Sequence, residues 1–180
     1  MDLFLGAGWE SILTILEERH GEKMPEDIVE RFVKLADERM GHGLKAVQDA
    51  DKALSNLRRS FLTCVASNGE RANVFKGLGI TGLLPHFHAA QIFTKNQVER
   101  PKPAPDLFLF ACEKMQVEPA NALVIEDSVA GVAAARAAGI HVLGFTGTAH
   151  DKENHAEMLK NAGADAIIDT LIHIEAHLKT

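Results

Sequence analysis

The sequence has little that would suit a disulfide-stabilised, membrane-bound or nucleic-acid-binding protein. Its two cysteines, Cys64 and Cys112, lie far apart in apolar segments and form neither a CxxC pair nor a disulfide framework, which favours a reducing cytoplasm. The formal net charge of −6 gives no support to nucleic acid or an anionic membrane as partner, because these attract basic surfaces. The start, "MDLFLGAGW", has no basic leader, and no apolar run approaches the length of a membrane span. We therefore expect a soluble, cytoplasmic protein.

What is present suits a globular protein with one main domain. The chain has 180 residues, of which 46% are hydrophobic and 24% charged, enough for a substantial core. This length predicts one domain, or one domain with a small appendage. The oligomeric state is left open by the sequence.

The first 43 residues have a purely helical pattern. Residues 9–21 place Trp9, Ile12, Leu13 and Leu16 on one face, and Gly21 is a suitable C-terminal stop. Residues 25–41 begin with proline and acidic residues, as helices often do. Their periodicity predicts that Ile28, Phe32, Leu35 and Ala36 face inward. The "GHG" at 41–43 is interpreted as a linker.

Strands and helices alternate in the rest of the chain. Runs that are apolar without alternation indicate strands buried on both faces, and hence an α/β fold with a parallel sheet and helices on both sides. The expected strands are 61–67, 89–93, 122–126, 141–145 and 165–169. The expected helices are 70–79, 104–115, 128–139 and 154–163.

Polar residues follow three of these strands, where ligands collect in open parallel sheets. Ser67 and Asn68 open a turn into a helix, whose first N–H groups can bind an anion. Lys102 lies between two prolines that stiffen its loop. Glu126 and Asp127 offer oxygen ligands to a hard cation such as Mg²⁺. An anion cradle, an ammonium and a carboxylate pair at one rim are what phosphate chemistry requires.

Each feature has a simpler structural interpretation. "SNG" is a common turn, a surface lysine is usually solvated, and "ED" before serine also fits helix capping. The order of these features at successive strand ends favours a site over coincidence. Arg71, one turn past Ser67, fits a solvated helix face better than an anion ligand. The histidine pairs 86/88, 150/155 and 173/177 lack a cysteine or carboxylate to complete a metal site, so metal-ligand roles are not favoured.

Three segments resemble motifs of the haloacid dehalogenase superfamily, specifically its phosphatase and phosphomutase branch with a helical cap. These segments are "VASNGE", "RPKPAPDLFLFA" and "LVIEDSVAGVAAARAAG", and they resemble the second, third and fourth motifs. The resemblance covers nearly the whole chain and implies a Rossmann-like core over 44–180 with part of a cap over 1–43. It further implies bound Mg²⁺, phosphoryl transfer through an aspartyl-phosphate, and a small phosphorylated metabolite, a sugar or sugar-acid phosphate, as substrate.

The resemblance also implies a role for each site residue. Asp127 would bind the metal and Glu126 would support it. Ser67 would hold a phosphate oxygen with help from the backbone amide of Asn68. Lys102 would bridge the phosphate and the nucleophile. The metal-independent dehalogenases carry a different fourth motif, so "IEDS" favours phosphate esters.

The sequence departs from this family at the first motif. That motif, DxDx(T/V), supplies the nucleophile and the acid/base from a strand ahead of the cap, and the chain does not contain it. Asp2, in "MDLFLG", is a poor substitute. We expect a chain that begins too late, with its central strand missing between 61–67 and 122–126. Two hypotheses remain: an enzyme whose nucleophile lies outside these residues, and an inactive relative that keeps an anion- and metal-binding pocket.

Overall fold

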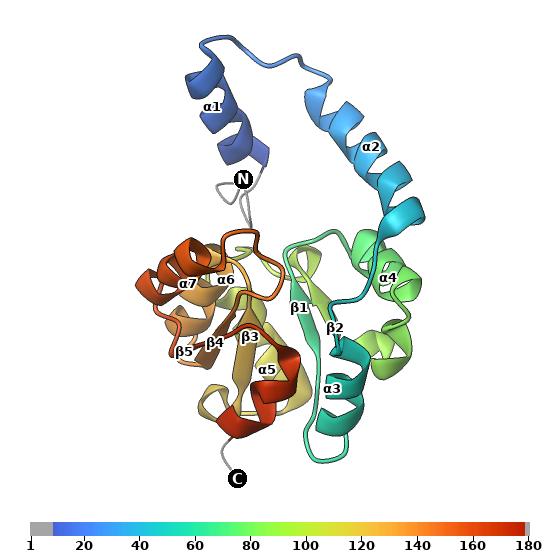
Figure 1. The fold of residues 1–180 in the computed structure, drawn as a ribbon, viewed down its shortest axis with the longest axis vertical. Coiled ribbons are helices and arrows are strands. Elements are labelled where there is room, and N and C mark those ends of the chain that lie inside the picture. Colours follow the sequence, from blue (N-terminus) through green and yellow to red (C-terminus); the bar gives the residue numbers. More distant parts are fainter. Residues whose placement is uncertain (1–8, 179–180) are drawn as a thin grey trace.

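The computed structural model describes residues 9–178 as two parallel sheets flanked by helices (Figure 1). Strand β1 (Val65–Ser67) pairs with β2 (Ile92–Thr94). Strand β4 (His141–Phe145) lies between β3 (Leu123–Glu126) and β5 (Ala166–Ile168). All pairings are parallel, so the predicted α/β class is confirmed. β4 matches its apolar run, whereas the other four strands are shorter than theirs. Phe61 and Leu62, expected in a strand, are exposed instead.

Helices lie on both faces, because successive residues of a buried strand point to opposite sides. Val142 packs with residues of α5 (Asp106–Met115), α6 (Val129–Ala137) and α7 (Lys152–Asn161). The next residue, Leu143, packs on the other face with residues of α3 (Ala50–Leu57) and the 3₁₀ segment η6 (Leu171–His177). The remaining core helix is α4 (Arg71–Ile80), which contacts β2.

Short 3₁₀ turns complete the connections between these elements. They are η2 (Leu84–His86), η3 (Ala89–Gln91), η4 (Lys95–Gln97) and η5 (Pro119–Asn121). Both cysteines are free. None of the helices within residues 9–178 has the length and apolar character needed to cross a membrane.

The two sheets are separated where β1 and β3 face each other. Within the described residues β1 pairs with β2 and β3 with β4, so one edge of each inner strand has no strand partner. The inner strands are also less buried than their neighbours: β2 is buried throughout, whereas all three residues of β1 are half-buried. Ile125 of β3 is 37% exposed. An open sheet normally buries its central strands best, so this burial pattern is reversed.

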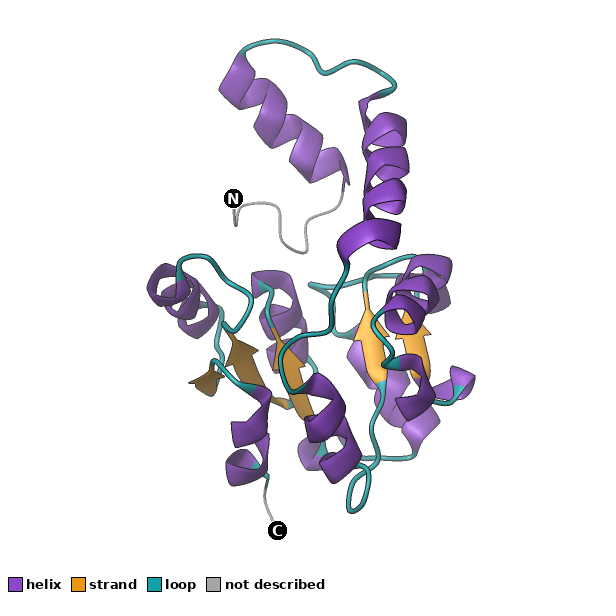
Figure 2. Ribbon diagram, turned by 45° about the vertical axis from the view of Figure 1, so that its right-hand side comes forward, coloured by secondary structure: helices purple, strands orange, loops and turns teal. Residues whose placement is uncertain are grey.

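The N-terminal helices α1 (Trp9–His20) and α2 (Ile28–Gly43) extend away from the sheets, beyond the end to which the strand arrows point (Figure 2). The prediction that Phe32 and Leu35 face inward is wrong, since they are 55% and 52% exposed. No described layer packs over this face of α2. The predicted linker at 41–43 is also wrong, because α2 continues to Gly43 before Leu44 becomes extended.

Candidate functional site

Lys102 joins the three strand-end segments that the sequence singles out. Its side chain is 6% exposed. Its Nζ donates to the carbonyl oxygen of Ala66 in β1 at 2.9 Å and to Oε1 of Glu126 at the end of β3. The ammonium also lies 4.5 Å from the ring centroid of Phe108. A buried ammonium requires such partners because desolvation of an unpaired charge is costly. Lys102 therefore links the two sheets at their carboxyl ends.

Asn68 fixes the loop that carries this lysine. Its amide donates to the Lys102 carbonyl at 2.9 Å, and its side-chain oxygen accepts from the Lys102 backbone N–H at 3.0 Å. This reciprocal pair holds the segment between Pro101 and Pro103, whose Lys102–Pro103 peptide bond is cis. The structure thus brings Asn68, Lys102 and Glu126 together at this rim. Ser67 ends β1 beside them, and its Oγ accepts from the Gly69 N–H at 3.0 Å.

Glu126 is held on both of its carboxylate oxygens. Oε1 accepts from Lys102, and Oε2 accepts from the Ser128 hydroxyl at 2.9 Å. The same hydroxyl caps α6 by accepting from the Gly131 N–H at 3.0 Å. A Cβ on Gly131 would lie 2.0 Å from the Glu126 carboxylate. The carboxylate therefore rests against the first turn of α6, and this contact requires glycine.

Asp127 is arranged differently from its neighbour. Asp127 is exposed, and none of the hydrogen bonds within the described residues links its carboxylate to Lys102. Its backbone carbonyl is instead 2.7 Å from Nε2 of His155 on α7. Within the described residues, the rim therefore carries one carboxylate that Lys102 and Ser128 engage and one that is exposed.

Other polar residues near the rim connect its loops. Glu70 accepts from Lys95 at 2.8 Å and from Asn96 at 2.9 Å, which ties the loop after β1 to the loop after β2. These two partners lower the pKa of the Glu70 carboxyl, the Lys95 hydrogen bond most of all. Arg71 does not form the solvated face that the sequence favoured. Its guanidinium donates to the carbonyls of Ile92 and Ala89, because α4 packs beside β2.

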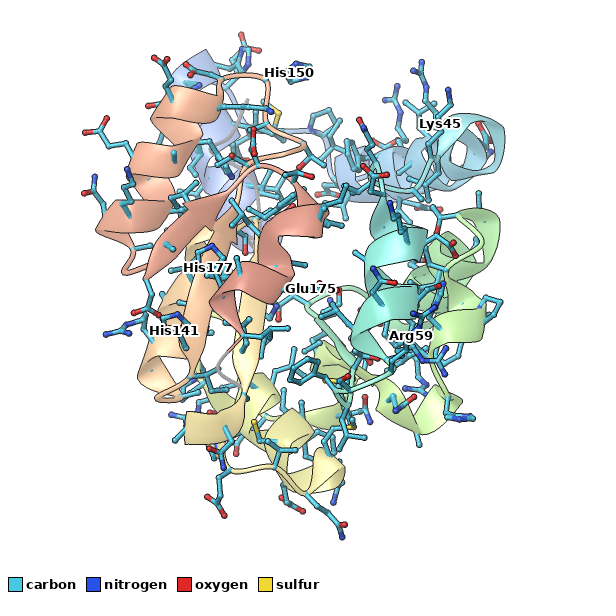
Figure 3. All side chains as sticks on the ribbon, turned by 60° about the horizontal axis from the view of Figure 1, so that its bottom comes forward. Lys45, Arg59, His141, His150, Glu175 and His177 are labelled. Atoms are coloured by element: carbon cyan, nitrogen blue, oxygen red, sulfur yellow. The ribbon has the colours of Figure 1, made fainter. Side chains whose placement is uncertain are left out.

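The histidines whose side chains the structure describes lie on several different elements. His141, at the start of β4, and His150, beyond its carboxyl end, lie well apart in Figure 3. His86 is buried and contacts Asp51 at 2.7 Å, and the side chain of His173 lies outside those described. Within residues 9–178 no three histidine, cysteine or acidic side chains are grouped as a ready-made metal site.

Two residues of this region could not be singled out from the sequence. Gly131 falls in an Ala-rich helix, where its only signal is the spacing "EDSxxG". His155 was considered only through its spacing to His150, whereas its contact is with a loop 28 residues away in the chain. Asp2, considered as a nucleophile, lies outside the described residues. The single Asp-x-Asp of the sequence, Asp49 to Asp51, opens α3 instead of following a strand.

Comparison with known proteins shows which family this chain resembles in sequence and in fold. The model of haloacid dehalogenase-like hydrolases matches residues 4–139. A conserved haloacid dehalogenase-like protein of unknown function from Agrobacterium tumefaciens shares 33% identity, with a TM-score of 0.88 over 97% of this chain and 78% of that one. A HAD family hydrolase from Deinococcus radiodurans, crystallised with bound phosphate and sodium, shares 28% identity, with a TM-score of 0.80 over 97% and 76%.

The curated relatives are longer than this chain. The 6-phosphogluconate phosphatase of Escherichia coli strain K12 is 28% identical over 150 residues, which are 83% of this chain and 66% of that protein. Across three curated relatives, the matched part spans 36% to 66% of the relative's length. The family model covers most of the chain and the structural similarity covers nearly all of it. The chain belongs to the haloacid dehalogenase-like hydrolase family.

Proposed function

We propose that this protein is the greater part of a Mg²⁺-dependent phosphatase that acts on a small phosphorylated metabolite. The observation that supports this most is the position of Lys102. Its buried ammonium is held between β1 and β3 by a carbonyl and a carboxylate, at the rim where Ser67 and Asn68 end the first strand. A fixed positive charge beside a helix N-terminus attracts and orients a phosphoryl group.

The roles of the rim residues follow from their contacts. Ser67 and the backbone N–H of Asn68 hold phosphate oxygens, because they lie just ahead of α4, whose first N–H groups lack helical partners. Lys102 neutralises charge on the phosphoryl group and on the attacking carboxylate. Glu126, bonded to Lys102 and to Ser128, keeps the ammonium in place.

A divalent cation fits the remaining carboxylate. Asp127 is exposed, and a carboxylate oxygen is the ligand that Mg²⁺ prefers. Glu126 supports the site next to it, and the described residues supply no third acid to complete a coordination shell. When bound, Mg²⁺ would neutralise the charge that develops on the phosphoryl oxygens. Asp127 would hold it, with further ligands from water, the substrate and residues beyond those described.

The nucleophile is the part that this sequence does not supply. The DxDx(T/V) motif of the family is absent from the 180 residues. The facing edges of β1 and β3, together with the exposure of Ile125, are consistent with a further strand between them. We place the aspartate nucleophile, and the aspartyl-phosphate that it forms, at the end of such a strand. Its carboxyl end would meet Lys102 and Asp127 at the same rim.

The proposed substrate is a sugar or sugar-acid phosphate in the cytoplasm. The relative from Escherichia coli is named for 6-phosphogluconate, a compound of this class. Residues 1–43 serve as part of a cap over the core of 44–180, since α1 and α2 extend beyond the carboxyl ends of the strands (Figure 2). A cap in this position would exclude water and select the organic part of the substrate.

The test is hydrolysis by a longer chain that carries a strand ending in DxDxT ahead of Met1. We expect release of phosphate from sugar phosphates with Mg²⁺, loss of activity on chelation, and loss of at least 100-fold in kcat for Asp127→Ala. The matched control is Asp169→Ala, which removes another aspartate just past a strand end, here paired with Lys152 at 3.5 Å, and should leave kcat within about twofold.

The outcome also decides between the two hypotheses. Activity that is equal in the Asp127→Ala and Asp169→Ala variants would contradict the proposed metal role. Phosphate and Mg²⁺ binding without any turnover, with the DxDxT strand present, would instead favour the inactive binding module. Transfer of phosphate between two positions of one sugar, in place of release, would identify a phosphomutase.

A further inference from the structure

The backbone of Asp127 needs a support that its sequence neighbours do not supply. The carbonyl of Ser128 accepts from the Val132 N–H in the first turn of α6. The carbonyl of Asp127 precedes the helix and receives no helical hydrogen bond. Its only hydrogen bond within residues 9–178 is the contact of 2.7 Å with Nε2 of His155. The direction of the Asp127 side chain depends on this carbonyl, because both belong to the same residue.

His155 is held firmly at the place from which it makes this contact. The residue is 2% exposed and lies one helical turn before Leu159 of α7, which is fully buried in the core. The backbone N–H of His155 donates to the carbonyl of Asp151, the residue that caps α7. The imidazole therefore extends from a fixed helix to the loop after β3 and has little freedom to turn away.

The other ring nitrogen shows that this histidine is not an ordinary core residue. Nδ1 is buried without a hydrogen-bond partner within the described residues. Burial of an unpaired polar atom is unfavourable, and an apolar side chain would fill the same space without that cost. What the imidazole adds is a single directed bond to Asp127. A carbonyl oxygen can only accept, so Nε2 carries the hydrogen.

We propose that His155 is a positioning residue that fixes the Asp127 backbone and thereby aims its carboxylate at the cation site. The inference rests on the proposed function for the identity of the cation. It assigns to α7 a role in the site, although α7 lies beyond the three motifs that mark the rim. Groups that orient a metal ligand commonly affect metal affinity by about tenfold or more.

The test compares three substitutions in the 180-residue protein. In His155→Gln the side-chain amide is as many bonds from Cα as Nε2 is, so it can donate to the same carbonyl. In His155→Asn the amide nitrogen is only as many bonds from Cα as Nδ1 is, so the side chain is too short to reach the Asp127 carbonyl. His155→Leu keeps the volume without a donor and suits a buried position. Folding of each variant is checked by the dispersion of its ¹H–¹⁵N spectrum.

Two properties are measured in the wild type and in each variant. The first is the chemical shift of the Ser128 backbone amide, which responds to hydrogen bonding at the Asp127 carbonyl. In the wild type, the ¹⁵N spectrum of the imidazole also shows whether Nε2 carries the hydrogen. The second is Mn²⁺ titration, followed by line broadening at Asp127 and Ser128. We expect His155→Gln to keep the wild-type shift and Mn²⁺ affinity. We expect His155→Asn and His155→Leu to move the shift and to weaken Mn²⁺ binding about tenfold.

The outcomes separate this inference from the proposed function. Equal shifts and equal Mn²⁺ affinity in all three variants would overturn the positioning role, and so would an imidazole that carries its hydrogen on Nδ1 alone. Wild-type protein that shows the expected shifts but no Mn²⁺ broadening at Asp127 would overturn the metal role in the proposed function. In that case the dependence of the Ser128 shift on a donor at residue 155 would still support positioning of the backbone.

Discussion

Gly131 determines how closely the Glu126 carboxylate can approach helix α6. Because an added Cβ would lie 2.0 Å from that carboxylate, Gly131→Ala must displace either the side chain or the helix. We expect a loss of about 1–3 kcal/mol in the free energy of unfolding, measured by urea denaturation. The contact of Glu126 with Lys102 should weaken with it.

Gly79 offers the matched control for this substitution. It lies in the last turn of α4, and a Cβ there would meet nothing within 4 Å. Gly79→Ala should therefore be neutral or stabilise the protein by up to about 1 kcal/mol, because alanine favours a helix over glycine. Equal effects of the two substitutions would show that the close approach of Glu126 to α6 does not exist in solution.

Lys102 and Glu126 are predicted to depend on each other. Their side chains are 6% and 10% exposed, so Lys102→Met leaves a carboxylate without its cation in a poorly solvated place. Breaking such a pair typically costs about 3–5 kcal/mol. Adding Glu126→Gln should recover much of this loss, since the amide carries no charge and can still accept from Ser128. Urea denaturation of the single and double variants measures the coupling, and purely additive losses would contradict it.

Residues at this scale differ in how well the sequence could reveal them. Asn68, Lys102 and Glu126 follow strand ends, where parallel topology alone brings them to one rim. The carboxylate of Asp127 follows the same rule, and its metal role stays a prediction. The contact of His155 depends instead on how α7 packs against the sheet, which periodicity does not specify. The guanidinium of Arg71 turned toward β2 for the same reason.

At the scale of elements, the start of α6 serves both the helix and the site. The Ser128 hydroxyl accepts from the Gly131 N–H and donates to Glu126. Ser128→Ala should cost about 1–2 kcal/mol in the free energy of unfolding, as loss of a capping side chain does. It should also weaken phosphate binding, because Glu126 then holds Lys102 less firmly. Urea denaturation and phosphate titration by calorimetry measure the two effects.

Asp151, the N-cap residue of α7, provides the matched control for Ser128. Asp151 accepts from the Asn154 N–H at 3.1 Å, and none of its hydrogen bonds within residues 9–178 reaches Lys102, Glu126 or Asn68. Asp151→Ala should therefore lower stability by a similar amount and leave phosphate affinity unchanged. If both variants bind phosphate as the wild type does, the proposed link between the α6 cap and Lys102 is incorrect.

The elements themselves were predictable where their patterns extend over several turns or where apolar runs are sharply bounded. The five strands and the helices α1, α2, α4, α5, α6 and α7 all correspond to predicted segments. The eight-residue helix α3 and the 3₁₀ segment η6 were not predicted, because each is short and depends on contact with the other across one face of the sheets. The prediction that one face of α2 is buried was wrong for the opposite reason. The helical periodicity is present, but no described layer covers that face.

At the scale of the whole molecule, the main feature beside the site is the break between the two sheets. The parallel order β2–β1 and β3–β4–β5 leaves two strand edges facing each other, yet the core of α5, α6 and α7 also includes Ala66 of β1 and Val124 of β3. One continuous core therefore lies behind two separate sheets. The sequence predicted unpaired inner edges only through the family motif that is absent from the 180 residues, since nothing in the composition indicates them.

The most direct measurement compares phosphate release from a panel of sugar phosphates, with Mg²⁺, by the 180-residue chain and by a chain extended with a strand that ends in DxDxT. We expect no specific turnover by the short chain, and turnover together with a higher free energy of unfolding in the extended one. Replacing the first aspartate of DxDxT with asparagine should abolish the activity but keep the gain in stability. Robust turnover by the short chain that survives Asp2→Ala would show that the nucleophile lies elsewhere and would contradict the proposed site.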